Sequence, residues 1–388
     1  MVRTMRATSV RTLILALVVG SMLASTASTA GAAASRGASA RYIVVFKNSV
    51  QHPAAAATAQ AKRTSSKVSF VYRSALKGYS ARIPASQVAS LRANPSVAYV
   101  VRDTRVSIDT TQSNATWGLD RIDQANLPLS GTYTYTNTGA GVKAYIIDTG
   151  IRYSHQDFGG RAVPGFDAMI PGGPANDCNG HGTHVSGTVG GSTYGVAKGV
   201  TLVGVRVLSC AGTGLTSWVI AGVDWVTQNH QAGQPAVANM SLGGGVNAAL
   251  DQAVRNSITD GVAYGVAAGN DNVDACTSSP ADVSQAMTVG ATDATDTRAS
   301  FSNFGSCVDW FAPGVNITSD WFLTDSSTNT ISGTSMATPH TVGVAALYLQ
   351  SNPGASPASV AGALAGLTTK GIVKQANSAN NNLLFTNL

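Results

Sequence analysis

Glutamate is absent from this chain of 388 residues, and all 19 acidic side chains are Asp. One class of zinc-dependent hydrolases places a Glu directly after the first of two closely spaced His ligands. The chain has a close pair in His181 and His184, but Gly182 follows the first of them. The missing Glu argues against that class of metal hydrolase. A metal-dependent hydrolase remains an alternative only because two His residues at this spacing could bind zinc.

Long hydrophobic runs are also missing. The apolar stretch at residues 13–23 is too short to span a bilayer comfortably, and no later run reaches the length of a membrane helix. This stretch follows three Arg residues and precedes the small residues 32–34, an arrangement typical of a secretory signal. We expect residues 1–34 to be removed during export, the alternative being an uncleaved membrane anchor.

Positive charge is scarce in most of the chain. Residues 1–109 hold 15 of the 25 Lys and Arg with only two Asp, a net charge of +13, whereas residues 110–388 hold ten Lys and Arg against 17 Asp, a net charge of −7. The pI of about 9.2 therefore reflects the N-terminal segment. A basic protein suggests a function on nucleic acid or on an anionic membrane, but this charge division removes the support for either.

Cysteine is rare and is confined to the second part of the chain. The four cysteines are Cys178, Cys210, Cys276 and Cys307. An even number of cysteines in an exported protein suggests disulfides. Three pairings are possible from the sequence.

Residues 35–109 show alternating strand and helix patterns. We expect strands at 42–46, 78–83 and 97–106, and helices at 57–67 and 85–93. These patterns predict a small α+β unit that is separate from the rest of the chain.

Residues 110–388 are long enough to form one large domain with a substantial core. Short apolar runs at 142–147, 202–208, 236–240 and 262–268 alternate with helical patterns such as 217–229 and 248–259. The alternation predicts an α/β fold in which helices cover both faces of a parallel sheet. Ligands of such sheets bind beyond the carboxyl ends of the strands, where we expect Asp148 and Asn270.

Three segments, at 148–150, 181–184 and 333–339, carry the residue types that acyl transfer needs. A serine hydroxyl is a weak nucleophile, so it needs an imidazole to take its proton and a carboxylate to hold that imidazole in one tautomer. Ser335, His181 and Asp148 could supply these groups. Their order along the chain, Asp then His then Ser, is one of three known orders of the serine hydrolase triad.

Ser335 follows a strand-like segment at 330–332 and stands where a helix extending to about residue 348 is expected to begin. The N–H groups of a first helical turn lack intrahelical partners and lie at the positive end of the helix dipole. The Ser335 N–H can therefore face an oxyanion. Taken alone, Asp148 could equally be a capping residue after a strand, and Asn270 a turn residue.

These motifs resemble those of the subtilisin-like serine proteases, in particular the proteinase K branch and its secreted aqualysin-type bacterial members. Residues 239–245, 267–270 and 302–307 match the same family in order and spacing, and the likeness extends from about Trp117 to the C-terminus. The resemblance implies a three-layer α/β fold with a mainly parallel central sheet. It also implies a serine endopeptidase.

The resemblance implies a role for each matching residue. Ser335 would be the nucleophile, His181 the general base and Asp148 the carboxylate that orients it. The Asn270 side-chain amide would join the Ser335 N–H in binding the oxyanion. His184 would be a packed helix residue.

The resemblance also implies how a peptide substrate is bound. Two segments would hold its backbone by strand addition, and a third would line the first specificity pocket. The residues of the three segments are Gly212, Thr213 and Gly214; Ser241, Leu242 and Gly243; and Ala267, Ala268 and Gly269. Because these pocket residues are small and uncharged, we expect broad cleavage after apolar or aromatic residues. Without the family resemblance, the three consecutive glycines at 243–245 would be interpreted as an ordinary flexible turn.

Disulfide pairing and metal binding follow only from the resemblance. It implies the bridges Cys178 to Cys210 and Cys276 to Cys307, and structural Ca²⁺ at one or two sites, with no catalytic cofactor. One calcium site would use Asp309 with the carbonyls of Ser284 and Ala286, and the other Asp120, Asp123, Gln124, Ser130 and Thr132. Each cluster could instead be a solvated acidic loop.

Residues 35–109 resemble the inhibitory propeptide of the same family, a ferredoxin-like α+β domain that occupies the cleft until the enzyme cuts the junction. We therefore expect a signal peptide at 1–34, a propeptide at 35–109 and a catalytic domain at 110–388. The mature product would be a secreted, extracellular monomer that acts on proteins and peptides and is inhibited by its own propeptide. We expect no nucleic-acid or membrane partner. The alternative for residues 35–109 is a structural domain that is retained in the mature protein. The alternative for the whole protein is a non-catalytic binding or inhibitory protein on the same scaffold.

Overall fold

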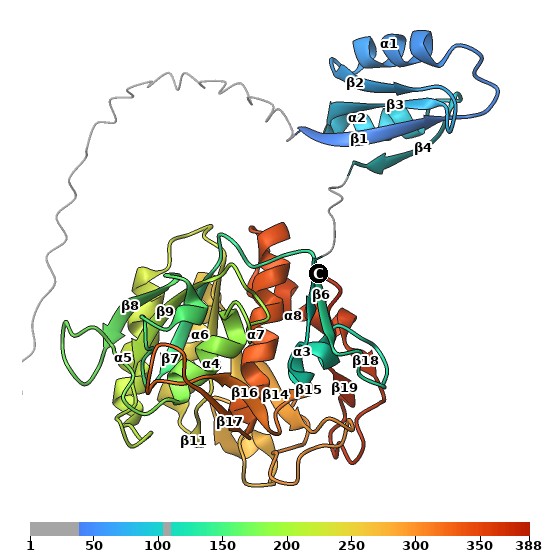
Figure 1. The fold of residues 1–388 in the computed structure, drawn as a ribbon. Coiled ribbons are helices and arrows are strands. Elements are labelled where there is room, and N and C mark those ends of the chain that lie inside the picture. Colours follow the sequence, from blue (N-terminus) through green and yellow to red (C-terminus); the bar gives the residue numbers. More distant parts are fainter. Residues whose placement is uncertain (1–38, 104–109) are drawn as a thin grey trace, which may run out of the picture. The chain divides into compact units, whose positions relative to one another are not determined.

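The structure is a computed structural model that describes residues 39–103 and 110–388. These ranges fall into two compact units, which are described separately (Figure 1). The expected signal peptide at 1–34, the expected processing junction between 109 and 110, and the end of the strand expected at 97–106 lie wholly or partly outside the described residues.

The first unit has the element order β-α-β-β-α-β. Its elements are β1 (Ser39–Phe46), α1 (Pro53–Arg63), β2 (Lys67–Tyr72), β3 (Gly78–Pro84), α2 (Ala85–Arg92) and β4 (Val97–Arg102). The sheet order is β2-β3-β1-β4 and every neighbouring pair is antiparallel. This element order is that of the ferredoxin-like unit.

Two sequence predictions for this unit differ from the structure. The helix expected at 57–67 spans Pro53–Arg63, because Pro53 occupies its first turn and the chain leaves the helix at Thr64. Strand β2 was not predicted. All of its residues are exposed or only half-buried, so the sequence lacks the clear apolar alternation that predicts a strand.

The second unit is built on a sheet of nine strands. Its order is β18-β19-β15-β14-β12-β10-β7-β9-β8, and its pairs are parallel except for β18 with β19. The strands are β7 (Lys143–Asp148), β8 (Ala162–Asp167), β9 (Thr201–Arg206), β10 (Ala236–Met240), β12 (Ala263–Ala267), β14 (Met287–Thr292), β15 (Trp310–Pro313), β18 (Thr369–Lys370) and β19 (Asn382–Leu383).

Helices cover both faces of this sheet (Figure 1). The helices are α3 (Trp117–Ile122), α4 (His181–Gly190), α5 (Thr216–Asn229), α6 (Ala248–Asp260), α7 (Thr334–Ser351) and α8 (Pro357–Leu367). The small elements are β5 (Thr110–Ser113), β6 (Thr132–Tyr135), β11 (Gly244–Gly245), β13 (Ser278–Ser279), β16 (Ile317–Asp320), β17 (Thr328–Ile331), and the 3₁₀ turns η1 (Gln156–Phe158) and η2 (Ala275–Thr277).

Alternate residues of β7 enter two different cores. Ala144 and Ile146 pack in the core that contains α4, α7 and α8, whereas Tyr145 and Ile147 pack in the core that contains α5 and α6. All four side chains are fully buried. Because successive side chains of a strand point to opposite faces, a strand covered on both sides reads as a continuous apolar run, which is why the sequence predicted it.

The layered architecture sets the position of the site. Strands β10 and β12 are parallel to β7 and lie next to one another in the sheet, so their carboxyl ends meet at one edge. Asp148 ends β7, and Asn270 follows β12 after a short turn. The two residues therefore lie at the edge where parallel sheets bind ligands.

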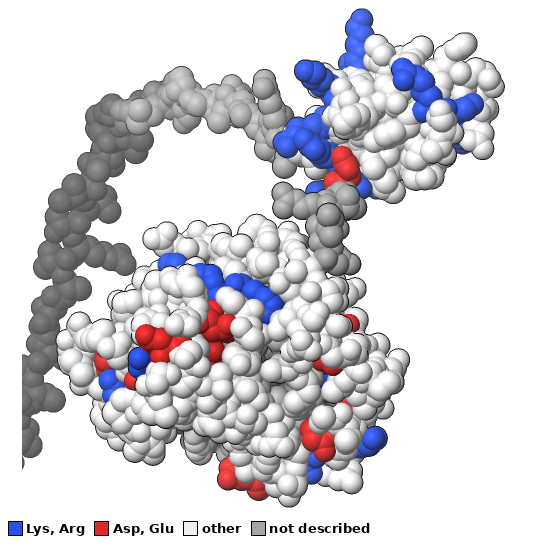
Figure 2. Space-filling model, in the orientation of Figure 1, with Lys and Arg blue, Asp and Glu red and all other residues white. Residues whose placement is uncertain are grey.

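Charge is distributed unevenly over the surface. In Figure 2 the visible face of residues 110–388 is mostly uncharged, with a few mixed groups of basic and acidic side chains. The charged side chains visible on the unit at 39–103 are mainly Lys and Arg, in agreement with its sequence. Within these two ranges, no helix has both the length and the apolar character needed to cross a membrane.

Candidate active site

Asp148 and His181 form a close hydrogen-bonded pair. His181 Nδ1 lies 2.8 Å from Asp148 Oδ1 and 2.9 Å from Oδ2. The Asp148 carboxylate is fully buried, whereas 25% of the His181 side-chain surface is exposed. A buried carboxylate on Nδ1 places the ring proton there and leaves Nε2 free to accept a proton.

The electrostatic surroundings of His181 favour its charged form. Desolvation lowers the pKa of the imidazole, but the Asp148 charge, the hydrogen bond that His181 Nδ1 donates to Asp148 and the Asp177 charge together raise the pKa above its ordinary value. A raised pKa suits a base that must hold a proton and then release it.

His184 has a different environment on the same helix. It is completely buried, its Nε2 lies 3.0 Å from the Ile317 carbonyl oxygen, and its Nδ1 has no hydrogen-bond partner. Burial lowers the pKa of His184 to about 3, so it is neutral. Since Nε2 is engaged by a backbone carbonyl, the geometry does not favour a metal site shared with His181.

Ser335 is the second residue of α7. Its hydroxyl donates a hydrogen bond to the Ser241 carbonyl oxygen at 3.1 Å, and the Ser241 hydroxyl donates in return to the Ser335 carbonyl oxygen at 2.8 Å. The Ser335 hydroxyl is thus not hydrogen-bonded to His181 in this conformation. Catalytic hydrogen bonds are often formed only once substrate is bound.

Asn270 is oriented by the start of α7. Its Oδ1 accepts hydrogen bonds from the Thr334 N–H at 2.8 Å and from the Thr334 hydroxyl at 3.0 Å. A Cβ added at Gly333 would lie 3.6 Å from Ser335 N and 3.8 Å from Asn270 Nδ2. The two nitrogens therefore border the same small space, where they could act together on an oxyanion.

The nine predicted substrate-binding residues line two cavities. The first, of ≈ 440 Å³, is lined by residues that include His181, the segment 212–214 and the segment 241–243. The second, of ≈ 490 Å³, is lined by residues that include Ser335, Asn270 and the segment 267–269. Leu242 and Gly243 line both, so the cavities are neighbours.

Sequence reasoning missed one charged residue of the second cavity. Asp271 follows Asn270 and lines this cavity, whose other predicted walls are small and uncharged. The side chain is exposed. The matching segments considered in the sequence ended at Asn270, so this carboxylate was outside them.

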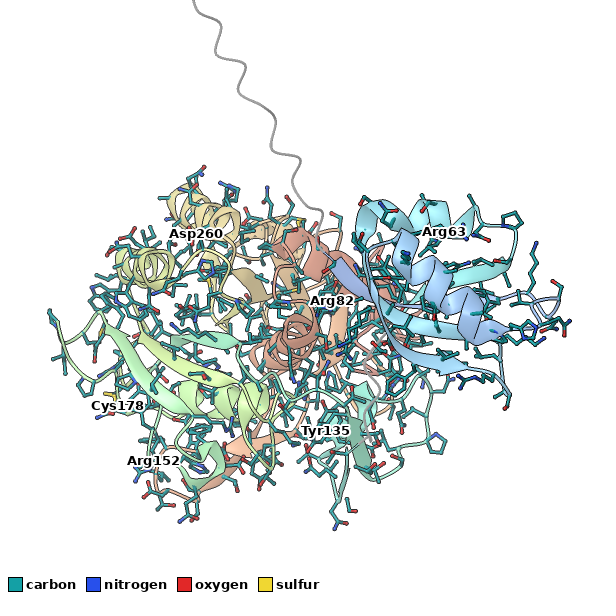
Figure 3. The ribbon with its side chains drawn as sticks, turned by 90° about the horizontal axis from the view of Figure 1, so that it is seen from above. Arg63, Arg82, Tyr135, Arg152, Cys178 and Asp260 are labelled. Carbon is teal, nitrogen blue, oxygen red and sulfur yellow. A yellow bond between two sulfur atoms is a disulfide. The ribbon has the colours of Figure 1, made fainter. Side chains whose placement is uncertain are left out.

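The disulfide pairs are the ones that the resemblance implies. Cys178 is bonded to Cys210 and Cys276 to Cys307, with sequence separations of 32 and 31 residues. Figure 3 shows Cys178 near the margin of its unit, in the region that also contains Arg152. Because Cys178 precedes His181 by three residues, its bridge restrains the turn that leads into α4.

The two expected calcium clusters differ in how well their oxygens are already bonded. Asp120 accepts hydrogen bonds from the backbone N–H groups of Ser130 and Gly131 and from the Ser130 hydroxyl. Asp123 Oδ1, in contrast, is buried without a partner, and burial raises the pKa of Asp123 to about 6. Thr132 is bonded to Ser130 through the two hydroxyls, at 2.8 Å.

Gln124 in the first cluster and Asp309 in the second also form hydrogen bonds within the protein. The Gln124 amide nitrogen donates to the carbonyls of Asn126 and Pro128, at 3.1 and 2.9 Å. Asp309 Oδ2 accepts from the Thr288 N–H at 2.8 Å, close to the segment 284–286, and burial raises the pKa of Asp309 to about 6. Across residues 39–103 and 110–388, no three His, Cys or Asp side chains are grouped to hold a metal ion.

Comparisons with known proteins agree with this geometry. Residues 139–384 match the family described as the subtilase family, and residues 41–109 match the family described as peptidase inhibitor I9. An extracellular serine proteinase of a Thermus species is 57% identical over 365 residues, which are 89% of this chain and 88% of that relative. An alkaline serine exoprotease A of Vibrio alginolyticus is 53% identical over 82% of this chain and 60% of its own length.

A solved structure gives the same result for the fold. The crystal structure of a cold-adapted subtilisin-like serine proteinase is 56% identical, with a TM-score of 0.69, and the match covers 71% of this chain and all of that chain. The expected subtilisin-like fold, with its mainly parallel sheet between helices, is thereby confirmed. The chain belongs to the subtilase family of serine peptidases and carries a unit of the peptidase inhibitor I9 family before its catalytic domain.

Proposed function

We propose that this chain is a secreted, self-processing serine endopeptidase in which Asp148, His181 and Ser335 form the catalytic triad. Ser335 Oγ attacks the carbonyl carbon of the scissile peptide bond, and His181 Nε2 takes the hydroxyl proton. His181 then gives that proton to the departing amine, and an acyl-enzyme forms. A water molecule then attacks the carbonyl carbon of the acyl-enzyme, with His181 again as the base, and the carboxylic acid product leaves Ser335.

The observation that carries this proposal is the Asp148 carboxylate on His181 Nδ1 at 2.8 Å. It holds the tautomer in which Nε2 can act as a base and stabilises the imidazolium that forms. The space shared by Ser335 N and Asn270 Nδ2 beside Gly333 supports the assignment of the oxyanion donors. Removing one such donor typically costs about 2.7–4 kcal/mol of transition-state stabilisation.

The substrate chain would lie along the two cavities. Segments 212–214 and 241–243 supply backbone groups for an extended peptide, and Gly244 and Gly245 continue the second segment as β11, paired with β13. Ala267, Ala268 and Gly269 give the second cavity small walls. We therefore propose a broad preference that favours apolar and aromatic residues before the scissile bond.

The unit at 39–103 would act as an intramolecular inhibitor that the enzyme removes. Its match to the peptidase inhibitor I9 family supports this role. The domain division 1–34, 35–109 and 110–388 is part of the proposal. Export is supported by the signal-like N-terminus and by relatives that include a proteinase described as extracellular.

Structural calcium fits both clusters. The buried, unpartnered Asp123 Oδ1 is the oxygen that most needs a cation, and Asp309 is buried with one backbone donor. Gln124, Ser130 and Thr132 would complete the first site with Asp120, and the carbonyls of Ser284 and Ala286 the second. Because carboxylates are few, hydroxyl and backbone oxygens would be needed, a mixture that suits Ca²⁺. The ion would stabilise loops and would take no part in the reaction.

Two treatments of one preparation test this function. We expect a serine-directed sulfonyl fluoride to abolish cleavage of a protein substrate, and a zinc chelator to leave it intact in the presence of calcium. Inhibition by the chelator alone would favour a metal hydrolase. Activity unaffected by the sulfonyl fluoride would contradict the proposed mechanism.

Processing is tested with Ser335→Ala. This variant, expressed in a protease-deficient host, should accumulate as a precursor that keeps residues 35–109, whereas the parent protein should yield a product that starts near Thr110. N-terminal sequencing of the two proteins distinguishes the outcomes. Normal maturation of Ser335→Ala would contradict self-processing.

A further inference from the structure

Asp177 accepts hydrogen bonds from both sides of the catalytic pair. Its Oδ1 accepts from the Thr149 hydroxyl and from the N–H groups of Asn179 and Gly180, each at 2.9 Å. Its Oδ2 accepts from the Thr183 N–H at 2.9 Å and from the Thr183 hydroxyl at 2.6 Å. These five donors come from the turn after β7 and from residues 179–183, which lead into α4 and form its start, the two segments that carry Asp148 and His181.

Thr149 connects Asp177 to Asp148 itself. The Thr149 N–H donates to Asp148 Oδ1 at 2.7 Å, while its hydroxyl donates to Asp177 and accepts from the Gly182 N–H at 2.8 Å. The residue after Asp148 is therefore hydrogen-bonded to the residue after His181. A shift of either segment would disturb both the Asp177 bonds and the 2.8 Å contact between Asp148 and His181.

Thr183 adds a second connection between the same segments. Its hydroxyl donates to Asp177 and accepts from the Arg152 N–H at 3.0 Å. Gly150 makes the approach possible: its φ is +105°, and a Cβ at this position would lie only 2.8 Å from Asp177 N. The backbone of the Asp148 turn is thus packed directly against the segment that contains Asp177.

We propose that Asp177 is a positioning residue of the catalytic site, which holds Asp148 and His181 in register and adds a second negative charge behind the imidazole. This inference rests on the proposed roles of Asp148 and His181. Asp177 does not touch the reacting atoms, and it acts through the two residues that do. Groups held this way by hydrogen bonds from rigid elements keep catalytic geometry within the narrow limits that rate acceleration requires.

The charge of Asp177 gives this role a signature that a purely structural residue would lack. The carboxylates facing His181 are Asp148 and Asp177, and the other imidazole nearby, His184, is neutral. Asp177 is one of the groups that raise the pKa of His181. Removing its charge should lower the pKa of His181, so the base stays unprotonated to a lower pH and the acid limb of kcat/KM moves to lower pH.

Asp177→Asn is the direct test, measured on mature enzyme with a chromogenic peptide and with active sites titrated by a fluorophosphonate. An Asn amide can accept the bonds at one oxygen but would present an N–H group to the Thr183 donors. We expect kcat to fall by roughly 100-fold with little change in KM, the effect of a displacement of about 1 Å. The acid limb should move to lower pH.

Asp293→Asn is the matched control. Asp293 Oδ1 also accepts from two backbone N–H groups and a Thr hydroxyl in a loop, and the residue lines neither site cavity. This variant should retain the parental kcat and pH profile. An Asp177→Asn enzyme that keeps kcat within threefold, or that loses kcat with an unmoved acid limb, overturns the proposal.

Thr183 provides a second test if Asp177→Asn fails to fold. Thr183→Val removes the bond at 2.6 Å and should lower kcat by about tenfold, whereas Thr183→Ser keeps the hydroxyl and should restore most of it. Equal activities of the two variants would overturn the proposal. A failed proposed function would show differently, because the parent enzyme itself would then resist the sulfonyl fluoride.

Discussion

Asn270 and Thr334 are joined by two hydrogen bonds, in which the Thr334 N–H and hydroxyl donate to Asn270 Oδ1 at 2.8 and 3.0 Å. The oxygen of the Asn270 amide is therefore hydrogen-bonded to Thr334, the first residue of α7. Its nitrogen is left facing the space beside Gly333, which Ser335 N also borders. Thr334 therefore determines which atom of Asn270 is offered to a substrate.

Asn270→Asp tests the donor role, since it keeps the oxygen that Thr334 binds and replaces the NH₂ group by a second oxygen. We expect kcat to fall by about 10²–10³-fold with a small change in KM, because the interaction is made mainly in the transition state. Steady-state kinetics on a peptide anilide measure this. Asn272→Asp, two residues away and outside both cavities, is the control and should keep its activity.

Asp271→Asn tests the carboxylate that lines the second cavity. We propose that the small walls of this cavity favour apolar residues, but a negative charge there attracts Lys and Arg side chains. The variant should therefore cleave after Lys or Arg less well, by severalfold, while cleavage after Phe stays unchanged. Digestion of a peptide library by both enzymes compares the two directly. Identical ratios of basic to aromatic cleavage would show that Asp271 does not contribute to specificity.

The two disulfides should contribute similarly to stability but differently to activity. Each closes a loop of about 30 residues, so replacing either pair by Ser should cost roughly 3–4 kcal/mol of unfolding free energy. Only the Cys178→Ser/Cys210→Ser protein should also lose kcat, because Cys178 adjoins Asp177. Denaturant unfolding of the sulfonyl-fluoride-treated proteins measures stability without autolysis. Equal loss of kcat in both double variants would argue against a special role of the first bridge.

Asp320 should make the protein less stable in alkali. It is fully buried, neither carboxyl oxygen accepts a hydrogen bond, and burial, with the neighbouring Asp157 carboxylate, raises the pKa of Asp320 to about 8. The folded chain therefore binds this proton more tightly than the unfolded chain. The resulting stability is complete below the ordinary Asp pKa and is lost as the pH rises through 8, by an amount on the order of a few kcal/mol.

Asp320→Asn removes this dependence, because an amide can donate to Asp157 at every pH. The other charged or titratable groups facing Asp320 are His155, Arg161 and Tyr194, and they remain. We expect the variant to melt at a higher temperature than the parent at pH 9 and at a similar temperature at pH 5. The exposed Asp224→Asn should track the parent at both pH values. A parallel pH dependence of Asp320→Asn and the parent would contradict the prediction.

Calcium removal should destabilise the second unit. Binding at 100 times Kd stabilises a protein by about 2.7 kcal/mol, so a chelator should lower Tm clearly and added Ca²⁺ should restore it. Asp123→Asn should reduce the calcium-dependent part of Tm, since it removes the buried oxygen that lacks a partner. If the melting temperature of the parent protein did not depend on calcium, the proposal of both calcium sites would be contradicted.

The sequence predicted best the elements that are buried on two sides. The strand at 236–240 was predicted with its observed bounds, and the start of β7 was within one residue, because strands covered by helices on both faces read as unbroken apolar runs. Strand β2 was missed because its side chains face solvent, so burial places little constraint on its sequence.

The candidate site divides in a similar way. Asp148, His181, Asn270 and Ser335 stand in short motifs that can be found without a structure. Asp177 stands in none, since its five donors come from two segments, the turn at Thr149 and residues 179–183, which only the fold brings together. Asp320 is likewise an ordinary Asp in the sequence, and its unusual state follows from packing against Asp157 and α4.

Mass spectrometric mapping of the sulfonyl fluoride adduct on mature enzyme tests the central claim most directly. The claim is that one hydroxyl, Ser335 Oγ, is activated by His181 and Asp148. It predicts one adduct per molecule, located on Ser335, whose formation parallels the loss of proteolysis and is abolished by His181→Ala. An enzyme that stays active with Ser335 fully modified, or that loses activity through an adduct elsewhere, would contradict it.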